Sequence, residues 1–283
     1  MTYVEALNWG KQQLAEAQVA EAELDAWLLL EYVTGMNRAA YFLQQRDGMK
    51  LSAYESYRDL ILQRKNRIPL QHLTGTQEFM GLPFQVSEDV LIPRQDTETL
   101  VELVLPEIKG KRILDVCTGS GCIAISLQKL GEPAVCHGVD ISLQALAVAN
   151  RNRRSLQAEV TLWQSDLFSQ VTEIYDVIVS NPPYIPPSEI ITLMPEVREY
   201  EPRLALDGGE DGLEFYRRLA SDAGTYLEEN GQIYLEIGFD QGEAVAELLE
   251  KHGFCDVIVH SDLAGLDRVI SAKWEKSLEG KKE

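Results

Sequence analysis

The feature that most restricts the fold is an alternation of short apolar runs with helical patterns after Arg94. Helices are expected over 97–105 and onward from Ser120 and Ser142, and strands over 112–116, 134–139, 160–163, 176–180, 232–236, 257–260 and 268–272. Strands made almost entirely of Ile, Leu and Val must be buried on both faces, and strands that alternate with helices pair in parallel. The pattern therefore predicts an α/β fold with a doubly wound, mostly parallel sheet.

The first 75 residues show a different periodicity. Apolar residues recur at spacings of three and four, which is typical of amphipathic helices. The expected buried positions are Leu7 and Leu14, then Leu24, Trp27, Leu28 and Tyr32, then Tyr54, Tyr57, Leu60 and Ile61. A small helical domain is therefore expected over 1–75.

A short linker separates the two patterns. Between Gln77 and Val86, Gly81 and Pro83 mark a turn between two extended pieces. A β-hairpin linker is expected over 76–95, and the second domain over 96–283. That domain ends in a charged tail from Lys276 to Glu283.

The net charge of −19 is unevenly divided along the chain. Residues 1–75 hold 8 Lys/Arg and 9 Asp/Glu, whereas the remainder holds 18 and 36, so the second domain carries nearly all of the negative charge. A duplex-DNA binder needs clustered Lys and Arg to neutralise phosphates. No DNA partner is expected, and a basic protein surface is the expected macromolecular partner.

Other classes of protein are excluded on similar grounds. No apolar run approaches the roughly 20 residues that span a bilayer, so no membrane partner is expected. The N-terminus lacks the basic stretch and apolar block of a secretory signal, which predicts a cytoplasmic location. The four cysteines and four histidines do not have zinc-site spacing. No metal is expected, and the thiols are expected to be buried and reduced.

A glycine-rich loop follows the strand over 112–116. Gly119 and Gly121 permit positive φ and a close approach of a ligand, and free amides at the start of the next helix face the same place. Asp140 ends the following strand, where a carboxylate can accept hydrogen bonds from two ribose hydroxyls. Together these features predict a nucleotide-cofactor site.

Asp115 helps to identify the cofactor. Gly119-x-Gly121-x-x-Ala124 also fits the dinucleotide fingerprint, which makes an NAD-dependent dehydrogenase an alternative. An acidic residue four positions before the first glycine suits a ligand with a cationic amino-acid moiety better than one with a pyrophosphate. The loop resembles motif I of class I methyltransferases, which implies S-adenosylmethionine. The expected contacts in the loop are Asp115, Cys117, Thr118, Gly119, Ser120 and Gly121.

Two further cofactor contacts are expected after the strand over 160–163, at the place where such folds contact adenine. Asp166 can accept a hydrogen bond from the exocyclic amine, and Leu167 can pack on the ring. A capped turn with a packed leucine explains the segment equally well.

The sharpest feature is Asn181-Pro182-Pro183-Tyr184, at the carboxyl end of the strand over 176–180. The prolines remove two backbone donors, so the turn presents two acceptors, the Asn181 side-chain oxygen and the Pro182 carbonyl. Two acceptors can hold both hydrogens of an amino group and direct its lone pair at a methyl group. We therefore expect nitrogen methylation, with Asn181, Pro182 and Tyr184 as catalytic residues. A rigid turn with an aromatic plug is the alternative.

Further segments are similar to the HemK/PrmC family of glutamine methyltransferases. They are Pro69–Gly75, Glu78–Phe84, Leu91–Glu98 and Glu201–Gly212, and the resemblance covers nearly the whole chain. It implies a Rossmann-like class I methyltransferase fold and methylation of the glutamine in the Gly-Gly-Gln motif of class I peptide chain release factors. It also implies that the helical domain helps to dock the release factor.

The resemblance assigns roles to individual residues. Cofactor contacts fall on Cys117–Gly121, Asp140, Leu167 and Asn181, and substrate contacts on Asn181, Pro182, Pro183 and Tyr184. Arg94 and Thr97 are expected to help close the cofactor pocket and to belong to the substrate-binding residues, although a helix N-cap at Asp96 explains that segment nearly as well. Gln95 stands where the family usually has proline. The loop Gly208–Gly212 either covers the target glutamine or is a solvated turn.

Three other functions fit parts of the pattern. The same tetrapeptide occurs in DNA adenine methyltransferases, but these grip phosphates and flip out a base, for which this acidic chain lacks a recognition domain. A ribosomal-protein glutamine methyltransferase is the closest alternative within the family. A binding module without turnover is the non-enzymatic alternative, and the intact Asp140, Asn181 and Tyr184 argue against it.

Overall fold

The computed structural model describes residues 1–275, which form two compact units. The first unit combines Met1–Thr76 with Met194–Tyr200, and the second combines Gln77–Leu193 with the chain from Glu201 onward. The chain therefore enters the first unit twice, and the second entry was not expected from the sequence. The charged tail expected over 276–283 lies outside the described residues.

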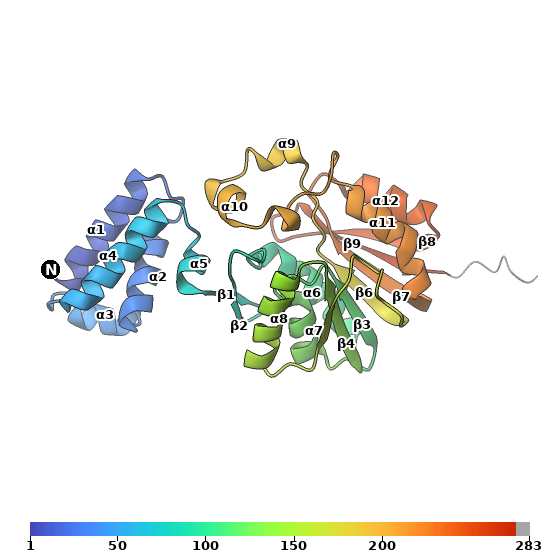
Figure 1. Ribbon diagram of the computed structural model, residues 1–283, viewed down its shortest axis with the longest axis horizontal. Helices are drawn as coiled ribbons and strands as arrows, with labels where there is room; N and C mark the ends of the chain where they lie inside the picture. Colours follow the sequence, from blue (N-terminus) through green and yellow to red (C-terminus); the bar gives the residue numbers. More distant parts are fainter. Residues whose placement is uncertain (276–283) are drawn as a thin grey trace, which may run out of the picture. The chain divides into compact units, whose positions relative to one another are not determined.

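The first unit is helical, as expected (Figure 1). Its helices are α1 (Tyr3–Glu16), α2 (Ala22–Thr34), α3 (Arg38–Gln44), α4 (Leu51–Lys65), the short α5 (Leu70–Thr74) and α10 (Pro195–Tyr200). Thr2 begins α1 with a capping box, in which the Thr2 hydroxyl accepts from Glu5 N and the Glu5 carboxylate accepts from Thr2 N. Gly35 ends α2 with a φ of 67°, which glycine adopts most readily.

Close packing between α1 and α4 forms the centre of this unit. A Cβ atom on Gly10 would overlap the Tyr57 hydroxyl oxygen, so only glycine leaves room at this position. The Tyr57 hydroxyl donates to the Ala26 carbonyl oxygen at 3.1 Å and thereby links α4 to α2.

The predicted buried face of α2 was partly wrong. Trp27 is buried, but Leu24 and Tyr32 are 45% and 56% exposed, and Leu29 and Leu30 are buried instead. Because the apolar run from Ala26 to Leu30 covers more than a full turn of helix, spacing alone did not show which side faces the core.

A buried ion network attaches α10 to the rest of the first unit. The Arg64 guanidinium donates to the Asp25 carboxylate at 2.7 Å and to the Glu196 carboxylate at 2.8 Å. Arg67 donates to the second oxygen of Glu196 at 2.7 Å. Burial raises the pKa of Asp25. Burial acts in the same direction on Glu196, but hydrogen bonds from Arg64 and Arg67 lower the pKa of this group below its ordinary value.

The second unit is built on a seven-stranded sheet in the order β5-β4-β3-β6-β7-β9-β8. The strands are β3 (Arg112–Val116), β4 (Val135–Asp140), β5 (Thr161–Gln164), β6 (Tyr175–Ser180), β7 (Leu227–Glu236), β8 (Phe254–Ser261) and β9 (Asp267–Trp274). All the expected strands are present, and β9 runs antiparallel to both of its neighbours, β7 and β8, whereas the other pairs are parallel. The mostly parallel sheet is confirmed. The strand order reverses at β3, which brings the carboxyl ends of β3, β4 and β6 together at a topological switch point.

Helices cover both faces of this sheet (Figure 1). The helices are α6 (Glu98–Val104), α7 (Cys122–Gly131), α8 (Leu143–Ser155), α11 (Glu214–Asp222) and α12 (Gly242–Lys251). Along β6, Val177 and Val179 belong to the core with α6 and α7, whereas Ile178 belongs to the core with α11 and α12. Consecutive residues thus face different cores, which explains why this strand is an unbroken apolar run.

The expected hairpin is formed by β1 (Thr76–Phe79) and β2 (Leu82–Gln85). Met80 and Gly81 make its turn with φ of 51° and 71°. Pro83, which was expected in the turn, lies in β2. Short helical segments complete the second unit: η1 (Gln95–Thr97), η2 (Leu105–Glu107), α9 (Pro187–Ile190), η3 (Arg203–Ala205) and η4 (Ala223–Tyr226).

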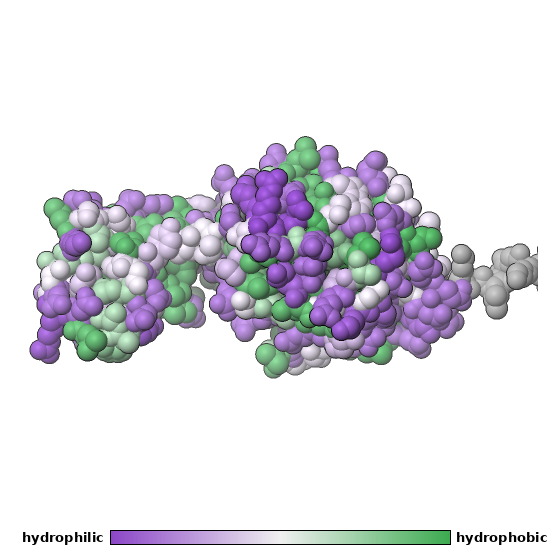
Figure 2. Space-filling view, turned by 90° about the horizontal axis from the view of Figure 1, so that it is seen from below, coloured by the Kyte–Doolittle hydropathy of each residue, from purple (hydrophilic) through white to green (hydrophobic). Residues whose placement is uncertain are grey.

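Hydrophobic and hydrophilic residues are interspersed over the face drawn in Figure 2. Exposed large apolar side chains occur in both units, for example Leu43 in the first and Leu263 in the second. Among the helices within residues 1–275, none combines the length and the apolar character needed to cross a bilayer.

Candidate active site

The loop between β3 and α7 is shaped by residues with positive φ. Gly119 and Gly121 have φ of 54° and 79°, and Cys117 has a φ of 63°. A Cβ atom on Gly119 would meet nothing within 4 Å, whereas one on Gly121 would lie 3.2 Å from the Ala149 side chain. Gly119 therefore leaves the backbone of the loop open to a ligand, and Gly121 permits close packing of the loop against α8.

Asp115 lies beneath this loop and is fully buried. Its Oδ2 accepts hydrogen bonds from the Thr118 hydroxyl at 2.6 Å and from Ala124 N at 3.1 Å. Burial raises the pKa of Asp115 to about 7. These bonds brace the loop from below, and Asp115 is not among the residues that line the cavity above it. Its expected contact with a cofactor stays a prediction.

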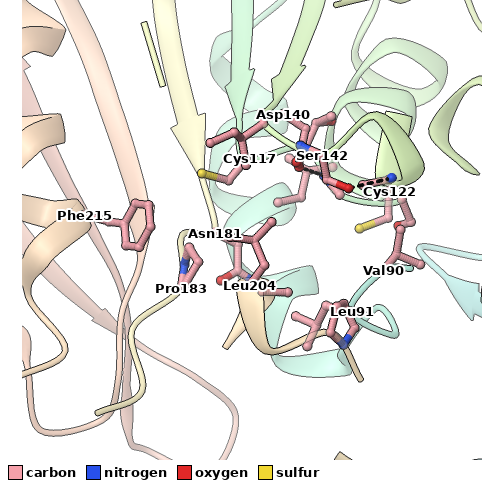
Figure 3. Close-up of a pocket in the computed structure, with 18 of the residues that line it drawn as sticks. Val90, Leu91, Cys117, Cys122, Asp140, Ser142, Asn181, Pro183, Leu204 and Phe215 are labelled. Atoms are coloured by element: carbon pink, nitrogen blue, oxygen red, sulfur yellow. Dashed lines mark hydrogen bonds between the residues drawn. The ribbon is translucent and has the colours of Figure 1, made fainter. Parts of the chain in front are cut away.

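A cavity opens at the carboxyl ends of β3, β4 and β6, where Figure 3 shows Cys117, Asp140 and Asn181. The predicted site residues that line it are Cys117, Thr118, Gly119, Ser120, Asp140, Asp166, Leu167, Asn181, Pro183, Arg94 and Thr97. Gly121, Pro182 and Tyr184 are not among its lining residues, and Tyr184 borders a neighbouring depression with Ile185 and Phe239. Most of the residues expected to bind cofactor or substrate therefore share one cavity.

Asp140 connects the end of β4 to the glycine loop. Its Oδ2 accepts from Gly119 N and its Oδ1 accepts from Ser142 N, both at 2.8 Å. Burial raises the pKa of Asp140, and these two hydrogen bonds act in the opposite direction. Because a carboxylate oxygen can accept two hydrogen bonds, both oxygens retain the capacity to accept from hydroxyl groups in the cavity.

The segment after β5 is a capped turn whose residues also line the cavity. The Ser165 hydroxyl donates to the Leu167 carbonyl oxygen at 2.7 Å and accepts from Gln170 N at 3.0 Å, so the capped turn is present. Leu167 and Asp166 also line the cavity. The Asp166 carboxylate accepts from Arg218 of α11 at 2.6 Å, and its contact with adenine stays a prediction.

Two lining residues of α11, Phe215 and Arg218, were missed in the sequence. Figure 3 shows Phe215 bordering the cavity near Pro183. Their spacing of three residues is ordinary for any amphipathic helix, so it carried no sign of a ligand.

The Asn-Pro-Pro-Tyr turn is fixed at the end of β6. The Ser180 hydroxyl donates to the Val116 carbonyl oxygen at 2.6 Å, which ties the start of the turn to β3. Asn181 Nδ2 donates to Thr97 Oγ1 at 3.3 Å, and the Oδ1 of the same amide is not used in this contact. Asp96 lies within η1 and does not cap α6, so the N-cap interpretation was wrong.

Tyr184 contacts an acidic residue, Glu236, that was not predicted to belong to the site. Its hydroxyl donates to Glu236 Oε1 at 3.2 Å. Glu236 ends β7, is 2% exposed, and has a pKa that burial raises to about 7. An isolated acidic residue at the end of an apolar strand was the only sequence signal. Glu236 lies near the Asn-Pro-Pro-Tyr turn because β7 pairs with β6 and places Leu235 opposite Ser180. The sequence alone does not show this pairing.

The loop Gly208–Gly212 packs against the main chain of Tyr184. A Cβ atom on Gly208 would lie 2.6 Å from Tyr184 Cα, and one on Gly212 would overlap the Tyr184 carbonyl oxygen. Gln241 Nε2 donates to the same carbonyl at 3.0 Å. The interpretation as a solvated turn was therefore wrong for these two glycines. That the loop covers a target glutamine stays a prediction.

Arg94 holds one wall of the cavity. Its guanidinium donates to both oxygens of Glu201, at 2.7 and 2.8 Å. Glu201 is 6% exposed, and burial raises its pKa although Arg94 acts against this. The residues that follow, Pro202, Leu204 and Ala205, line the cavity together with Arg94. Arg94 thereby positions this wall, and its partner Glu201 was missed as a site residue.

The cysteines are free thiols. Cys122 and Cys136 are buried, whereas Cys117 and Cys255 are half-buried. In the part of the chain that the structure describes, no group of three or more His, Cys, Asp or Glu side chains is arranged to hold a metal ion.

Both units contain a segment that matches a known protein family. Residues 5–75 match the family model of the PrmC N-terminal domain, and residues 94–194 match that of the methyltransferase small domain. The sequence is 42% identical over 274 residues to the release factor glutamine methyltransferase of Geobacter sulfurreducens, with 96% of each chain covered. It is 41% identical over 256 residues to that of Clostridium acetobutylicum, with 88% of this chain and 90% of the relative covered.

A solved structure supports the methyltransferase fold. The methyltransferase from Pyrococcus furiosus superimposes with a TM-score of 0.54 at 18% identity, with 77% of this chain and 98% of that chain covered. At this identity the likeness shows the fold alone.

Proposed function

Because the chain belongs to the family of release factor glutamine methyltransferases, we propose that it methylates the side-chain amide nitrogen of the glutamine in the Gly-Gly-Gln motif of class I peptide chain release factors. The observation that carries this proposal is that Asn181, Asp140 and the open glycine loop line one cavity. In this proposal S-adenosylmethionine donates the methyl group, and the protein acts in the cytoplasm.

The cavity residues fit S-adenosylmethionine. Asp140 has acceptor capacity for two ribose hydroxyls, and Gly119 leaves the loop accessible because nothing lies within 4 Å of its Cβ position. Leu167 and Phe215 offer apolar surface for a planar base. When bound, S-adenosylmethionine supplies an electrophilic methyl group.

The residues of the turn orient the target amide. Asn181 Oδ1 and the Pro182 carbonyl oxygen each accept one amide hydrogen, which fixes the nitrogen and directs its lone pair into the cavity. Amide resonance makes this nitrogen a poor nucleophile, so holding and desolvating it is the main contribution of the protein. As the new C–N bond forms, the methyl–sulfur bond of the donor would break and S-adenosylhomocysteine would leave as a neutral thioether. The nitrogen loses one of its protons afterwards, so no general base is required before the bond forms.

Replacement of Asp140 by alanine is expected to weaken binding of S-adenosylmethionine by about 10- to 100-fold, since hydrogen bonds to a charged group contribute about 1.5 to 3 kcal/mol. Isothermal titration calorimetry measures this change. Asp140 also holds Gly119 N, so thermal unfolding of the variant must be followed in parallel. An unchanged affinity would remove Asp140 from the cofactor site.

The helical unit is proposed to dock the release factor. Deletion of residues 1–75 is expected to slow methylation of an intact release factor by at least tenfold more than methylation of a short Gly-Gly-Gln peptide. Only the intact factor has further surface that can contact the helical unit, so only this substrate loses binding contacts. The ratio of the two kcat/KM values measures the effect.

The deletion requires its own control because Glu196 would lose its partners Arg64 and Arg67. The deleted chain should carry Glu196→Gln, and the matched control is full-length protein with Glu196→Gln alone. Retained cofactor affinity shows that the second unit is folded. If both substrates lose activity equally, the helical unit serves folding and not docking.

A further inference from the structure

An ion pair joins two residues that line the cavity, Asp166 and Arg218. Arg218 Nη2 donates to Asp166 Oδ1 at 2.6 Å. Asp166 follows β5 and Arg218 belongs to α11, so the pair connects segments that are 52 residues apart in the sequence. The Arg218 and Asp166 side chains are 39% and 48% exposed, and an ion pair with such exposure contributes little to stability. An effect of this pair is therefore expected in what the cavity binds.

The main chain of Asp166 is held beside the end of β4. Ser165 N donates to the Asp140 carbonyl oxygen at 3.0 Å, and Asp166 N donates to Ser169 Oγ at 3.2 Å. The Asp166 carboxylate takes no part in these bonds. Because Asp140 is proposed to bind the ribose hydroxyls, the base attached to that ribose can reach Asp166 and Leu167 in the neighbouring turn.

The other partner, Arg218, is held by a packed helix. Its neighbours Tyr216 and Leu219 are fully buried, and the Tyr216 hydroxyl donates to the Glu236 carbonyl oxygen at 2.8 Å. The Arg218 guanidinium also lies 5.9 Å from the centre of the Phe215 ring, within the range of a cation–π contact. Arg218 therefore gives Asp166 a donor in a defined position.

This donor decides which oxygen of Asp166 is available to a ligand. An arginine only donates hydrogen bonds and a carboxylate only accepts them, so Arg218 occupies Oδ1. Among residues 1–275 the structure shows no donor to Oδ2, which is left to accept from a ligand in the cavity. Adenine carries an amine, a donor, at its 6-position, whereas hypoxanthine carries an accepting oxygen there. A fixed acceptor on the cavity wall thus favours adenine.

We infer that Arg218 is a positioning residue for base specificity, which holds Oδ1 of Asp166 so that Oδ2 accepts a hydrogen bond from the exocyclic amine of adenine. This inference rests on the proposed function, because it takes S-adenosylmethionine as the methyl donor. It adds a residue that selects the base of that donor.

The first test is Asp166→Asn, which keeps the size of the side chain but gives it one acceptor and one donor group. Arg218 can only donate, so it should attract the amide oxygen and leave Nδ2 toward the base. The probes are S-adenosylhomocysteine and S-inosylhomocysteine, which differ only in the base, and isothermal titration calorimetry measures both Kd values. The wild type should bind the adenosyl compound about tenfold more tightly or better, and Asp166→Asn should favour the inosyl compound by about threefold or more. An unchanged preference in Asp166→Asn would overturn the inference.

Replacement of Arg218 by methionine tests whether Arg218 directs the side chain at position 166. In the double variant with Asp166→Asn the amide can turn either way, so the two Kd values should come within about threefold of each other. Arg218→Met alone should narrow the wild-type preference by about threefold or more, since neither carboxylate oxygen is then fixed. A general structural role would weaken both ligands alike. Preferences that Arg218→Met leaves unchanged in both backgrounds would contradict the inference.

Arg217→Met is the matched control, because it removes the same charge from the neighbouring position of α11. Arg217 Nη1 donates to Asp211 at 3.0 Å, and Arg217 is not among the residues that line the cavity. The ratio of the two Kd values should stay within about twofold of the wild-type ratio, since solvent and salt screen a charge at the surface. If Arg217→Met narrows the ratio as much as Arg218→Met, the charge of the helix selects the base and the inference is wrong.

The same titrations distinguish this inference from the proposed function. If the wild type does not bind S-adenosylhomocysteine, the proposed methyl donor is wrong and the proposed function fails. If the wild type binds it and methylates release factor but binds S-inosylhomocysteine equally well, only the inference fails.

Discussion

Replacement of Asn181 by alanine is expected to lower the kcat for methylation of release factor by about a hundredfold or more, while cofactor affinity changes little. The substitution removes one of the two acceptors that hold the target amide. It leaves the glycine loop and Asp140 in place, since their hydrogen bonds do not involve Asn181. The damage should therefore appear in the transfer step and not in the binding of the cofactor.

Asn181→Asp is the sharper comparison. It keeps an acceptor oxygen toward the target but replaces the donor that now faces Thr97 Oγ1. The Thr97 hydroxyl would then donate to the new carboxylate. Activity between that of the wild type and that of Asn181→Ala is expected in single-turnover measurements. Wild-type turnover by Asn181→Ala would show that the proposed mechanism is wrong.

The sheet could be predicted because its strands are buried on both faces. Val177, Ile178 and Val179 face two different cores, and this requirement leaves an unbroken apolar run that spacing rules detect. Asp140 and Asn181 were found for a related reason. Each stands at the carboxyl end of such a run, and parallel strands bring these ends to one edge of the sheet.

Asp115 shows what spacing leaves open. Its distance from the glycines suggests a contact with a charged ligand, which stays a prediction, and its Oδ2 accepts hydrogen bonds from the Thr118 hydroxyl and from Ala124 N beneath the loop. A carboxylate that braces a loop and one that binds a ligand occupy the same position in the sequence. Only the direction of the side chain distinguishes them, and no periodicity encodes this direction.

Glu236 and Glu196 could not be identified because their partners are remote. Glu236 contacts Tyr184, 52 residues away, and Glu196 contacts Arg64, 132 residues away. Neither acidic residue belongs to a motif of its own. Met194–Tyr200 belongs to the helical unit, and its ion pairs there are also with residues remote in the sequence. Periodicity therefore could not predict this membership.

The ion network of α10 leads to the second large effect. Replacement of Arg64 by methionine is expected to destabilise the first unit by about 3–5 kcal/mol at pH 7, because removal of one member of a buried network leaves charges without compensation. Arg64 and Asp25 are each 6% exposed, so solvent cannot replace the lost hydrogen bonds. Arg67 remains as a partner of Glu196, whereas Asp25 loses the bond at 2.7 Å that Arg64 supplied.

The loss of stability in Arg64→Met is expected to depend on pH in a defined direction. Burial already raises the pKa of Asp25 with Arg64 present, and without the guanidinium it should rise further. A carboxyl group whose pKa is higher in the folded than in the unfolded state binds a proton on folding, so its stabilising contribution is lost as the pH rises. The deficit of Arg64→Met relative to the wild type should therefore be largest at pH 7 and shrink toward pH 5.

Urea unfolding of the full-length chain measures the effect, since Trp9 and Trp27 report on the first unit. Arg58→Met is the matched control, because Arg58 lies exposed on the same helix α4 and should change stability by no more than about 0.5 kcal/mol. Adding Asp25→Asn and Glu196→Gln to Arg64→Met removes the uncompensated charges and should recover much of the loss. If Arg64→Met unfolds at the same urea concentration as Arg58→Met, the network contributes nothing to the stability of the helical unit, and α10 must be held there by other contacts.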